Sequence, residues 1–427
     1  MAAAAGANTY TTLAPVFTEQ YADKIVVLPP DVAILTEMAP FQKSKKTGKF
    51  YHQPVDLSFE QGVCLDSTGD AFDLTDPGPI AATMGDAQVQ ASSIVLPTRI
   101  SYAAISRAEG GVKQFVKSIE KKIESNAMGL AHAIETSHLY GQSGVCTANS
   151  IAASGTSGTF IVDAATWAPG WWYGSIGRAL DLYAAIGDAA KINTTAAIFV
   201  TGVTFSTRTV AFSCASGDAA AIDAMTVGTV FRRNAKTGAS AYAESVGVDK
   251  IATQASGNLF NIATTDPLWH GQSKDCGSAP LNLAKINGGF QLVANVGASG
   301  KYTLLCSPAV WSDLAAELAA QRMYDASYNS TELKAGSNGV KYFTQGLEIN
   351  VVRHRYIWQG VAYGVPMDGL VRIGSAEPQY RVPGFDEVLF PLPTHAGAEF
   401  RSYTDQALFS PLVASFLKFT SITPTNA

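Results

Sequence analysis

Three titratable side chains stand at regular spacing in the most helix-like part of the sequence. His132, Glu135 and His138 are three residues apart, a pattern that first suggests metal ligands. A helix turns by roughly 100° per residue, so the two histidines point in different directions and do not grip one ion together. We therefore expect a structural role, with Glu135 pairing or accepting a hydrogen bond near the helix end. The other histidines are far apart and form no catalytic signature: His52, His270, His354 and His395.

Two glycine-containing motifs fail as catalytic loops. Gly300-Lys301 is preceded by Asn295 where a phosphate loop needs glycine, and Tyr302 stands where such a loop needs serine or threonine. Gly297-Ala-Ser-Gly300 brings its second glycine one residue too early for a nucleophile elbow. The cysteines are far apart and suit a reducing compartment: Cys64, Cys146, Cys214, Cys276 and Cys306. We assign no catalytic residue, no metal site and no cofactor, and we expect that the chain is not an enzyme.

Two further clusters have more than one interpretation. Trp167, Trp171, Trp172 and Tyr173 beside Pro-Gly suit a packed corner or a subunit contact better than a ligand platform. Arg353-His354-Arg355 places two guanidinium groups on one face of a strand end. There they suit a carboxylate on a neighbouring chain or simply solvent.

The low charge of the chain favours an assembling subunit. Only 15% of its 427 residues are charged, whereas 47% are hydrophobic, and the formal net charge is -5. A surface covered by neighbouring subunits needs fewer solubilising groups than the surface of a monomer. The first residues lack the basic and apolar stretches of a secretory signal, and no apolar run approaches a membrane span. We therefore expect synthesis in the cytoplasm, no membrane partner and no sequence-wide attraction to nucleic acid.

The elements that must position these residues begin with a hairpin and a long helix. Two alternating segments within residues 48–96 are separated by an interval rich in Gly, Asp and Pro, which predicts a long two-stranded excursion. Apolar residues then recur at helical spacing from about Glu109 to Tyr140, with a Lys- and Glu-rich opposite face. A second helix is expected through Ile176, Leu180, Tyr183 and Ile186.

The later part of the chain alternates strands and turns. Short β-like pieces between about 194 and 289 predict a small all-β insertion. Lys301–Cys306 then predicts a strand, and Ser307 and Pro308 begin a helix as N-cap and first helical residue. Further strands are expected at 346–352, 360–363 and 370–373, and two more within 398–420.

This order of elements resembles the major capsid proteins of tailed double-stranded DNA phages, the Hong Kong 97-type fold. Local likenesses are Ile105–Glu109 entering the long helix, Ser307–Leu314 with the strand that follows, and Glu399–Asp405. The resemblance implies an α+β fold made of an N-terminal arm, an extended loop, a spine helix, an axial domain with the β-rich insertion at about 194–289, and peripheral return strands. The corresponding residues are 1–45, 46–102, 103–149, 150–384 and 385–427.

The resemblance also implies a shell-building function. It predicts hexamers and pentamers of the chain itself, a separate scaffolding protein, a portal, a possible decoration protein, packaged DNA bound without sequence specificity, and a place in the virion capsid. An encapsulin-like nanocompartment shell and a secreted β-rich adhesin are the alternatives. The candidate inter-subunit contacts are Lys45, Lys46, Lys49, Arg107, Glu109, Lys113, Lys117, Glu120, Glu124, Arg353 and Arg355.

Overall fold

The computed structural model describes most of the chain from Ala33 onward. The described residues are 33–43, 48–63, 65, 78–103, 112–185, 191–225, 227–232, 236–237, 241–242, 244–322, 340–380, 383–384 and 388–425. Of residues 112–121, 231–232, 236–237, 241–242 and 319–322 only the backbone is described. Most of the expected N-terminal arm therefore lies outside the described residues.

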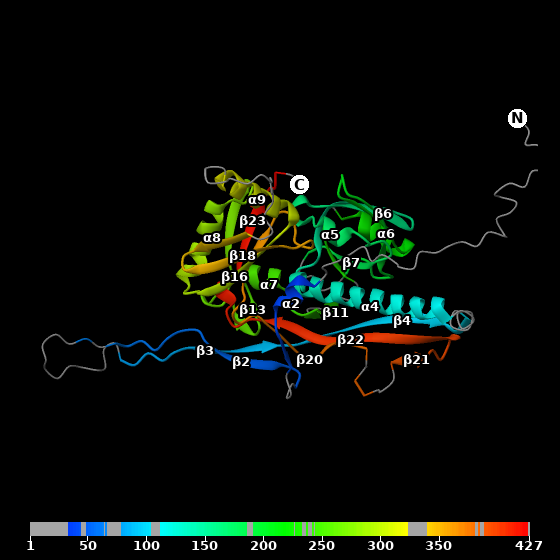
Figure 1. Ribbon diagram of the computed structural model, residues 1–427, viewed down its shortest axis with the longest axis horizontal. Coiled ribbons are helices and arrows are strands. Elements are labelled where there is room, and N and C mark those ends of the chain that lie inside the picture. Colours follow the sequence, from blue (N-terminus) through cyan, green and yellow to red (C-terminus); the bar gives the residue numbers. More distant parts are fainter. Residues whose placement is uncertain are drawn as a thin grey trace, which may run out of the picture. The chain divides into compact units, whose positions relative to one another are not determined.

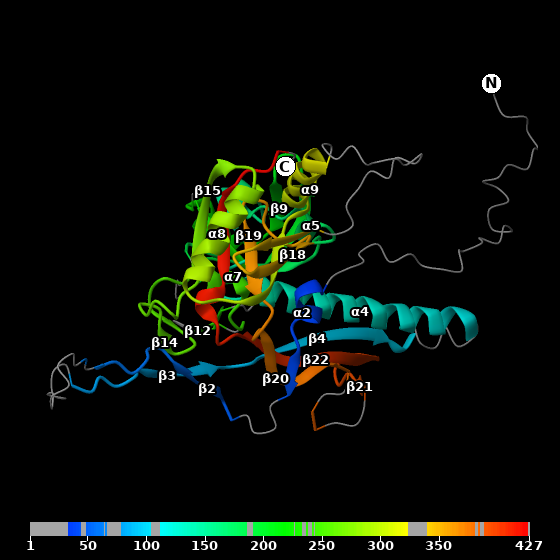
Figure 2. The same cartoon turned by 60° about the vertical axis from the view of Figure 1, so that its left-hand side comes forward.

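A five-stranded sheet carries the long helix on one face. Its strands are β1 (Phe41–Lys43), β4 (Ser92–Ser101), β20 (Val371–Gln379), β21 (Leu389–Pro391) and β22 (Gly397–Phe409). Strand β22 pairs with β4 along one edge, and β20 and β21 share its other edge. Helix α4 (Val112–Tyr140) lies along β4 and β22 (Figures 1 and 2).

Helix α4 confirms the expected spine helix and is tied to the sheet by a side chain. Alternate residues of β4 are partly buried, as expected for a strand with one covered face. Between them and the helix, the Asn126 amide donates to the Leu96 carbonyl at 3.1 Å and to the Thr98 hydroxyl at 2.8 Å. The helix therefore cannot slide along the sheet without breaking these partly buried hydrogen bonds.

The expected excursion is a β-hairpin with a long connection. Strands β2 (Tyr51–Asp56) and β3 (Met84–Val89) pair antiparallel, with Tyr51 opposite Val89 and Asp56 opposite Met84. These two strands form a sheet of their own. They lead away from β4 and β22 in Figure 1, where they are drawn in blue. Their base rests on the small β13–β14 pair (Asn258–Leu259 and Ile262–Ala263), since the Gln88 amide donates to the Phe260 carbonyl at 2.9 Å.

A closed six-stranded barrel follows helix α4. Its order is β10-β5-β6-β9-β8-β7. The strands are β5 (Cys146–Ser154), β6 (Ser157–Val162), β7 (Ala179–Tyr183), β8 (Ile198–Thr204), β9 (Thr209–Ser213) and β10 (Gly228–Arg232). Helix α6 (Ser216–Asp223) contacts β5, and the short helix α5 (Pro169–Trp172) lies between β6 and β7. Large apolar residues such as Phe160, Leu180 and Phe212 are buried within it.

The second large sheet has six strands, in the order β15-β23-β19-β16-β18-β17. They are β15 (Gln272–Ala279), β16 (Gly300–Cys306), β17 (Val340–Thr344), β18 (Leu347–Arg353), β19 (Ala362–Pro366) and β23 (Leu417–Ile422). Helices α7 (Val248–Thr253), α8 (Leu283–Asn295) and α9 (Pro308–Arg322) pack on it. At the start of α9, the Ser307 hydroxyl accepts from the Val310 amide at 3.4 Å, which confirms the expected N-cap.

Glycine brings α8 close to this sheet. A Cβ atom at Gly289 would lie 2.5 Å from the ring of Phe419. Phe419 and Phe290 are both fully buried in the core between α8 and the sheet. The absence of a side chain at Gly289 therefore sets the distance between the helix and β23.

Two predicted features are wrong. The expected helix through Ile176 is strand β7, preceded by Gly174 and Gly177 in left-handed conformation. The expected all-β insertion at 194–289 is not a unit of its own. Its first strands close a barrel with β5 and β6, which precede residue 194, whereas β15 pairs with β23 in the six-stranded sheet. Pairing with strands outside residues 194–289 thus decides whether a strand of this segment belongs to the barrel or to the six-stranded sheet.

The last part of the chain contributes strands to both large sheets. Strand β22 belongs to the five-stranded sheet, as expected for the return strands 385–427, but β23 lies inside the six-stranded sheet between β15 and β19. Strand β20, within the expected axial range 150–384, pairs with β22 and β1 in the five-stranded sheet. The division of the chain into five parts by sequence range remains a prediction.

Candidate functional site

The described part of the connection between β2 and β3, together with the first residue of β3, carries exposed apolar side chains. Phe59 is 81% exposed, Val63 75%, Leu65 90%, Ile80 47% and Met84 72%. We call these five residues the hairpin apolar patch. Monomeric proteins seldom expose apolar side chains in such a group, so the patch is a candidate surface for contact with another molecule.

The members of this patch are not among the contact residues predicted from the sequence. The sequence predicts the hairpin, with an interval rich in Gly, Asp and Pro between its strands. The signal was Phe59, Val63 and Leu65 in a Gly- and Asp-rich connection, where no hairpin core exists to bury them.

Most of the predicted contact residues lie outside the described residues or have undescribed side chains. The first group is Lys45, Lys46, Arg107 and Glu109, and the second is Lys113, Lys117 and Glu120, whose backbones belong to α4. Glu124 is exposed on α4. Lys49 is exposed before β2, with its ammonium 5.2 Å from the centre of the Phe50 ring. The role of all of these residues as inter-subunit contacts remains a prediction.

The two arginines expected on one face of a strand end lie in different places. Arg353 is the last residue of β18 and is exposed. Arg355 follows the strand in a turn, where its guanidinium lies 4.9 Å from the Tyr356 ring centre and donates to the Gly170 carbonyl at 3.4 Å. The chain turns at His354, so the expected shared face is wrong, and Arg355 packs within the subunit.

The aromatic cluster forms a packed corner of the barrel. Trp167, Trp171 and Trp172 are buried, and Trp167 and Trp172 stack with ring planes 15° apart. Tyr173 is exposed and stacks on Phe205 at 4.3 Å. The interpretation as a packed corner is therefore confirmed for the three tryptophans.

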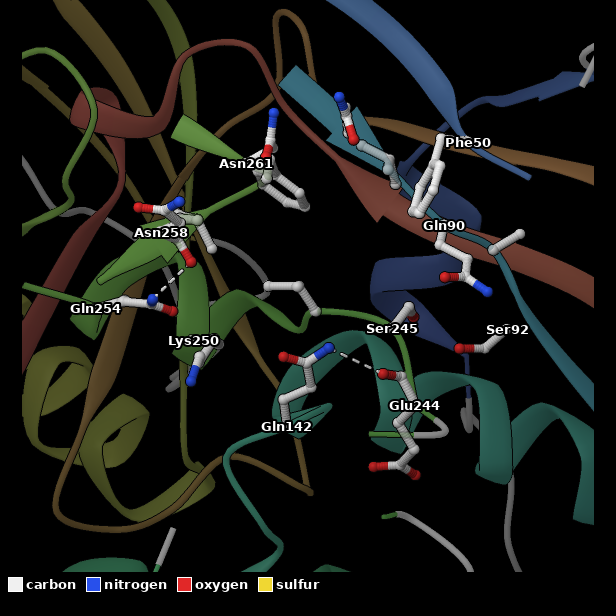
Figure 3. Close-up of a pocket in the computed structure, with 16 residues that line it drawn as sticks. Phe50, Gln90, Ser92, Gln142, Glu244, Ser245, Lys250, Gln254, Asn258 and Asn261 are labelled. Atoms are coloured by element: carbon white, nitrogen blue, oxygen red, sulfur yellow. Dashed lines mark hydrogen bonds between the residues drawn. The ribbon is translucent and has the colours of Figure 1, made fainter. Parts of the chain in front are cut away.

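An open cavity of about 490 Å³ lies at the base of the hairpin (Figure 3). Its walls are Phe50 and residues 88–92 on one side, Gln142 at the end of α4, and residues from 244 to 261. The Gln142 amide donates to the Glu244 carbonyl at 3.1 Å, and the Gln254 amide donates to the Asn258 carbonyl at 2.9 Å. Its side-chain amides offer both donors and acceptors to polar groups.

Lys250 is the cation in this cavity wall. Burial lowers the pKa of its ammonium, against the opposing charge of Asp249. Within the described ranges, no group of three or more His, Cys, Asp or Glu side chains is arranged to hold a metal ion. Among the described helices, none has the length and apolar character needed to span a bilayer.

Of the three residues that first suggested metal chemistry, Glu135 and His138 lie at a buried polar junction, whereas His132 is partly buried and lies outside it. Glu135 and His354 are both buried, and the Nε2 atom of His354 lies 2.7 Å from Oε1 of Glu135. Nδ1 of His138 lies 3.0 Å from the Thr36 hydroxyl, while Nε2 of His132 lies 3.2 Å from the Arg178 guanidinium. The two helix histidines thus have separate partners, and the expected hydrogen-bonding role of Glu135 is confirmed. The sequence gives no sign of His354 as a partner, because it lies far along the chain.

Comparisons with known proteins give a likeness of structure. Neither a protein-family model nor a curated protein matches the sequence. A chain of the cyanophage A-1(L) capsid asymmetric unit superposes with a TM-score of 0.60 at 12% identity, covering 97% of this chain and 100% of that one. A chain of Mycobacterium phage Bobi gives 0.49 at 11% identity, covering 96% and 98%. The capsid of a native GTA particle gives 0.49 at 10% identity, covering 97% and 98%. The likeness to the cyanophage A-1(L) chain shows that this chain has a phage capsid fold, the α+β architecture that the order of its sequence elements predicts.

Proposed function

We propose that this chain is the major capsid protein of a tailed double-stranded DNA phage, a structural subunit that assembles into an icosahedral shell. The observation that carries the proposal is the fold, which matches the cyanophage A-1(L) capsid chain over nearly the full length of both chains. Fold alone does not define function. Two properties of this chain's own surface therefore supply independent support.

The first support is the hairpin apolar patch. A two-stranded hairpin has little core of its own. Its patch side chains are exposed on the isolated subunit, so water must be removed from them by another chain if they are to stabilise anything. The occupant we propose is a second copy of this chain, since closed shells are built from repeated contacts between identical subunits.

The second support is the low charge. A chain with 15% charged residues has few solubilising groups for a free surface, and this agrees with subunits that cover one another. The partners we propose are copies of the chain in hexamers and pentamers, a separate scaffolding protein, a portal and a decoration protein. Packaged DNA would meet a subunit with net charge -5, which offers the duplex no overall electrostatic attraction and so suits packaging without sequence-specific binding.

Electron microscopy and sedimentation of the purified full chain test this function. We expect closed shells, formed by the chain alone or after addition of a scaffolding protein from the same phage. Particles from infected cells should contain DNA that resists added nuclease. Particles that enclose a protein cargo and no DNA would instead indicate a nanocompartment. A chain that stays monomeric at high concentration with scaffolding protein present would contradict shell assembly altogether.

A further inference from the structure

Glu135 is a buried carboxylate with a hydrogen-bond donor at each of its acceptor positions. Its Oε1 accepts from the Leu35 amide at 2.7 Å and faces His354 Nε2 at 2.7 Å. Its Oε2 accepts from the Thr36 amide at 3.0 Å and from the Thr36 hydroxyl at 2.6 Å. An ionised carboxylate has about four acceptor positions and no donor. The arrangement therefore fits the ionised form of Glu135, and a proton on either oxygen would face a donor.

A second contact of the His354 ring shows which of its two nitrogens carries a hydrogen. The Tyr356 amide donates to Nδ1 of His354 at 3.1 Å, so Nδ1 carries no hydrogen. The hydrogen must then be on Nε2, which donates to Glu135. His354 thus donates from Nε2 to Glu135 in this geometry, and Glu135 is the acceptor in all four of its contacts.

This junction joins three parts of the fold. Leu35 and Thr36 belong to the first turn of the short helix α2 (Ile34–Met38), Glu135 to α4, and His354 to the turn after β18. Ala33 provides no side-chain cap for α2. Glu135 replaces that cap by accepting the two amide hydrogens of the first turn from across the fold.

A second charged side chain holds the other end of the same segment. The Arg372 side chain donates from Nε to the Ala39 carbonyl, and its backbone amide donates to the Pro40 carbonyl, both at 2.8 Å. Its guanidinium also donates to Gln406 at 3.0 Å and lies 5.5 Å from the Phe41 ring centre. Residues 33–43 are thus fixed to the fold by Glu135 at one end and by Arg372 at the other.

We propose that Glu135 is a charge-operated latch, which holds residues 33–43 on helix α4 while it is ionised and releases α2 when it takes up a proton. The groups that face Glu135 are Thr36 from α2, His138 from α4, His354 and Tyr356 from the turn after β18, and, at longer range, Arg372 from β20. None of these side chains has a carboxylate that could accept the Leu35 and Thr36 amide hydrogens in place of Glu135. Release therefore loosens α2, while the segment stays attached through the Arg372 clamp, the pairing of β1 with β20 and the buried side chain of Leu35.

The direction of the pH response follows from the surroundings of Glu135. Burial raises the pKa of this carboxyl, but the hydrogen bond and the Coulombic effect of His354, together with the hydrogen bonds from Thr36 and Leu35, outweigh burial and hold the pKa below the ordinary value of 4.5. A lowered pKa in the folded state means that the hold is fully present above about pH 4.5 and is lost as the pH falls through the folded value.

Hydrogen exchange of the full-length subunit, read by mass spectrometry as protection factors, tests the latch. In Glu135→Gln the side-chain NH2 group can lie where Glu135 Oε2 accepts from Thr36, so that two donors face each other and those hydrogen bonds are lost. Protection of the peptide covering residues 33–43 should fall about tenfold or more at pH 7, because hydrogen bonds to a charged group are lost. The same peptide in the wild type should lose protection only below about pH 4.5, whereas Glu135→Gln should show no such pH step. Glu124→Gln, an exposed change on the same helix, is the matched control and should behave as the wild type.

Two results would overturn the latch. One is unchanged protection of residues 33–43 in a folded Glu135→Gln protein. The other is a loss of protection spread evenly over the barrel and both sheets, which would mean that Glu135 stabilises the whole fold without a local hold. If Glu135→Gln does not fold, Thr36→Val decides, since it removes one donor and keeps the carboxylate. It should lower protection in the same peptide alone, and unchanged protection there would also refute the proposal.

Discussion

Replacing Phe59, Leu65 and Met84 of the hairpin apolar patch with serine separates assembly from folding. The three side chains are 81%, 90% and 72% exposed, so they contribute little to the folded state of the isolated subunit. Exposed substitutions of this kind usually change the free energy of unfolding by about 0.5 kcal/mol or less. Stability measured by urea unfolding should therefore stay near that of the wild type.

The effect on assembly should be much larger. Burying one such side chain against a partner contributes about 1.5–3 kcal/mol, and nearly all of the area of these three is available for burial. Taking the lower value for each residue, their loss weakens each hairpin contact by about 4–5 kcal/mol, or more than a thousandfold in association constant. A shell repeats the contact in every subunit, so the triple variant should form no shells at protein concentrations at which the wild type assembles.

Sedimentation velocity and negative-stain microscopy across a concentration series measure this difference. Glu60→Ser, an exposed polar change in the same connection, is the matched control and should assemble normally. Normal shells from the triple serine variant at wild-type concentration would show that the patch is not an assembly contact. A large loss of urea stability in the variant would show instead that the patch is buried within the subunit.

Three further predictions concern the stability of the folded subunit, measured by urea unfolding. Asp249→Leu removes the carboxylate 2.6 Å from the Lys418 ammonium and should cost about 3–5 kcal/mol in urea unfolding, whereas adding Lys418→Met should recover most of that loss. Gly289→Ala should cost about 1–3 kcal/mol by overpacking against a buried ring of β23, whereas Gly288→Ala, on the same helix but without such a contact, should gain up to about 1 kcal/mol. The lowered pKa of Glu135 predicts that the urea midpoint of the wild type falls as the pH drops below about 4.5, and that Glu135→Gln shows a smaller fall. The ion-pair argument fails if Asp249→Leu is equally stable with and without Lys418→Met. The packing argument fails if Gly289→Ala and Gly288→Ala are equally stable. The pH argument fails if the urea midpoint of Glu135→Gln falls as much in acid as that of the wild type.

Elements with a local signal were predictable from the sequence. Helix α4 has apolar residues at helical spacing along its length, and Ser307 with Pro308 gives α9 both a cap and a first residue, so neither depends on distant partners. The hairpin likewise follows from two alternating segments.

Strand β7 shows why the rest was not predictable. Ile176, Leu180 and Tyr183 fit a helical spacing, but Leu180 and Leu182 are buried in the barrel and Ile176 is 73% exposed. The barrel is closed by strands far along the chain, and their pairing outweighs local periodicity. Gly174 and Gly177, both in left-handed conformation, are the local features here that disfavour a helix.

The junction was half predictable for the same reason. The position of Glu135 near the end of a helix indicated a hydrogen-bonding role, and geometry excluded a shared metal between the helix histidines. Its partners, Thr36 and His354, come from segments far away on either side in the sequence. No spacing rule links such residues, and only the fold brings them together.

The place of strand β23 also fixes when the subunit can finish folding. Residue 272 of β15 pairs with residue 417, and β23 separates β15 from the other four strands of its sheet. During synthesis, which adds about 5–20 residues each second, β15 has no neighbour on that side until residue 422 has left the ribosome. The closed barrel, complete by residue 232, has no such delay. A ribosome-bound chain thus holds a finished barrel beside an open sheet, and the six-stranded sheet is completed only after β23 has been made.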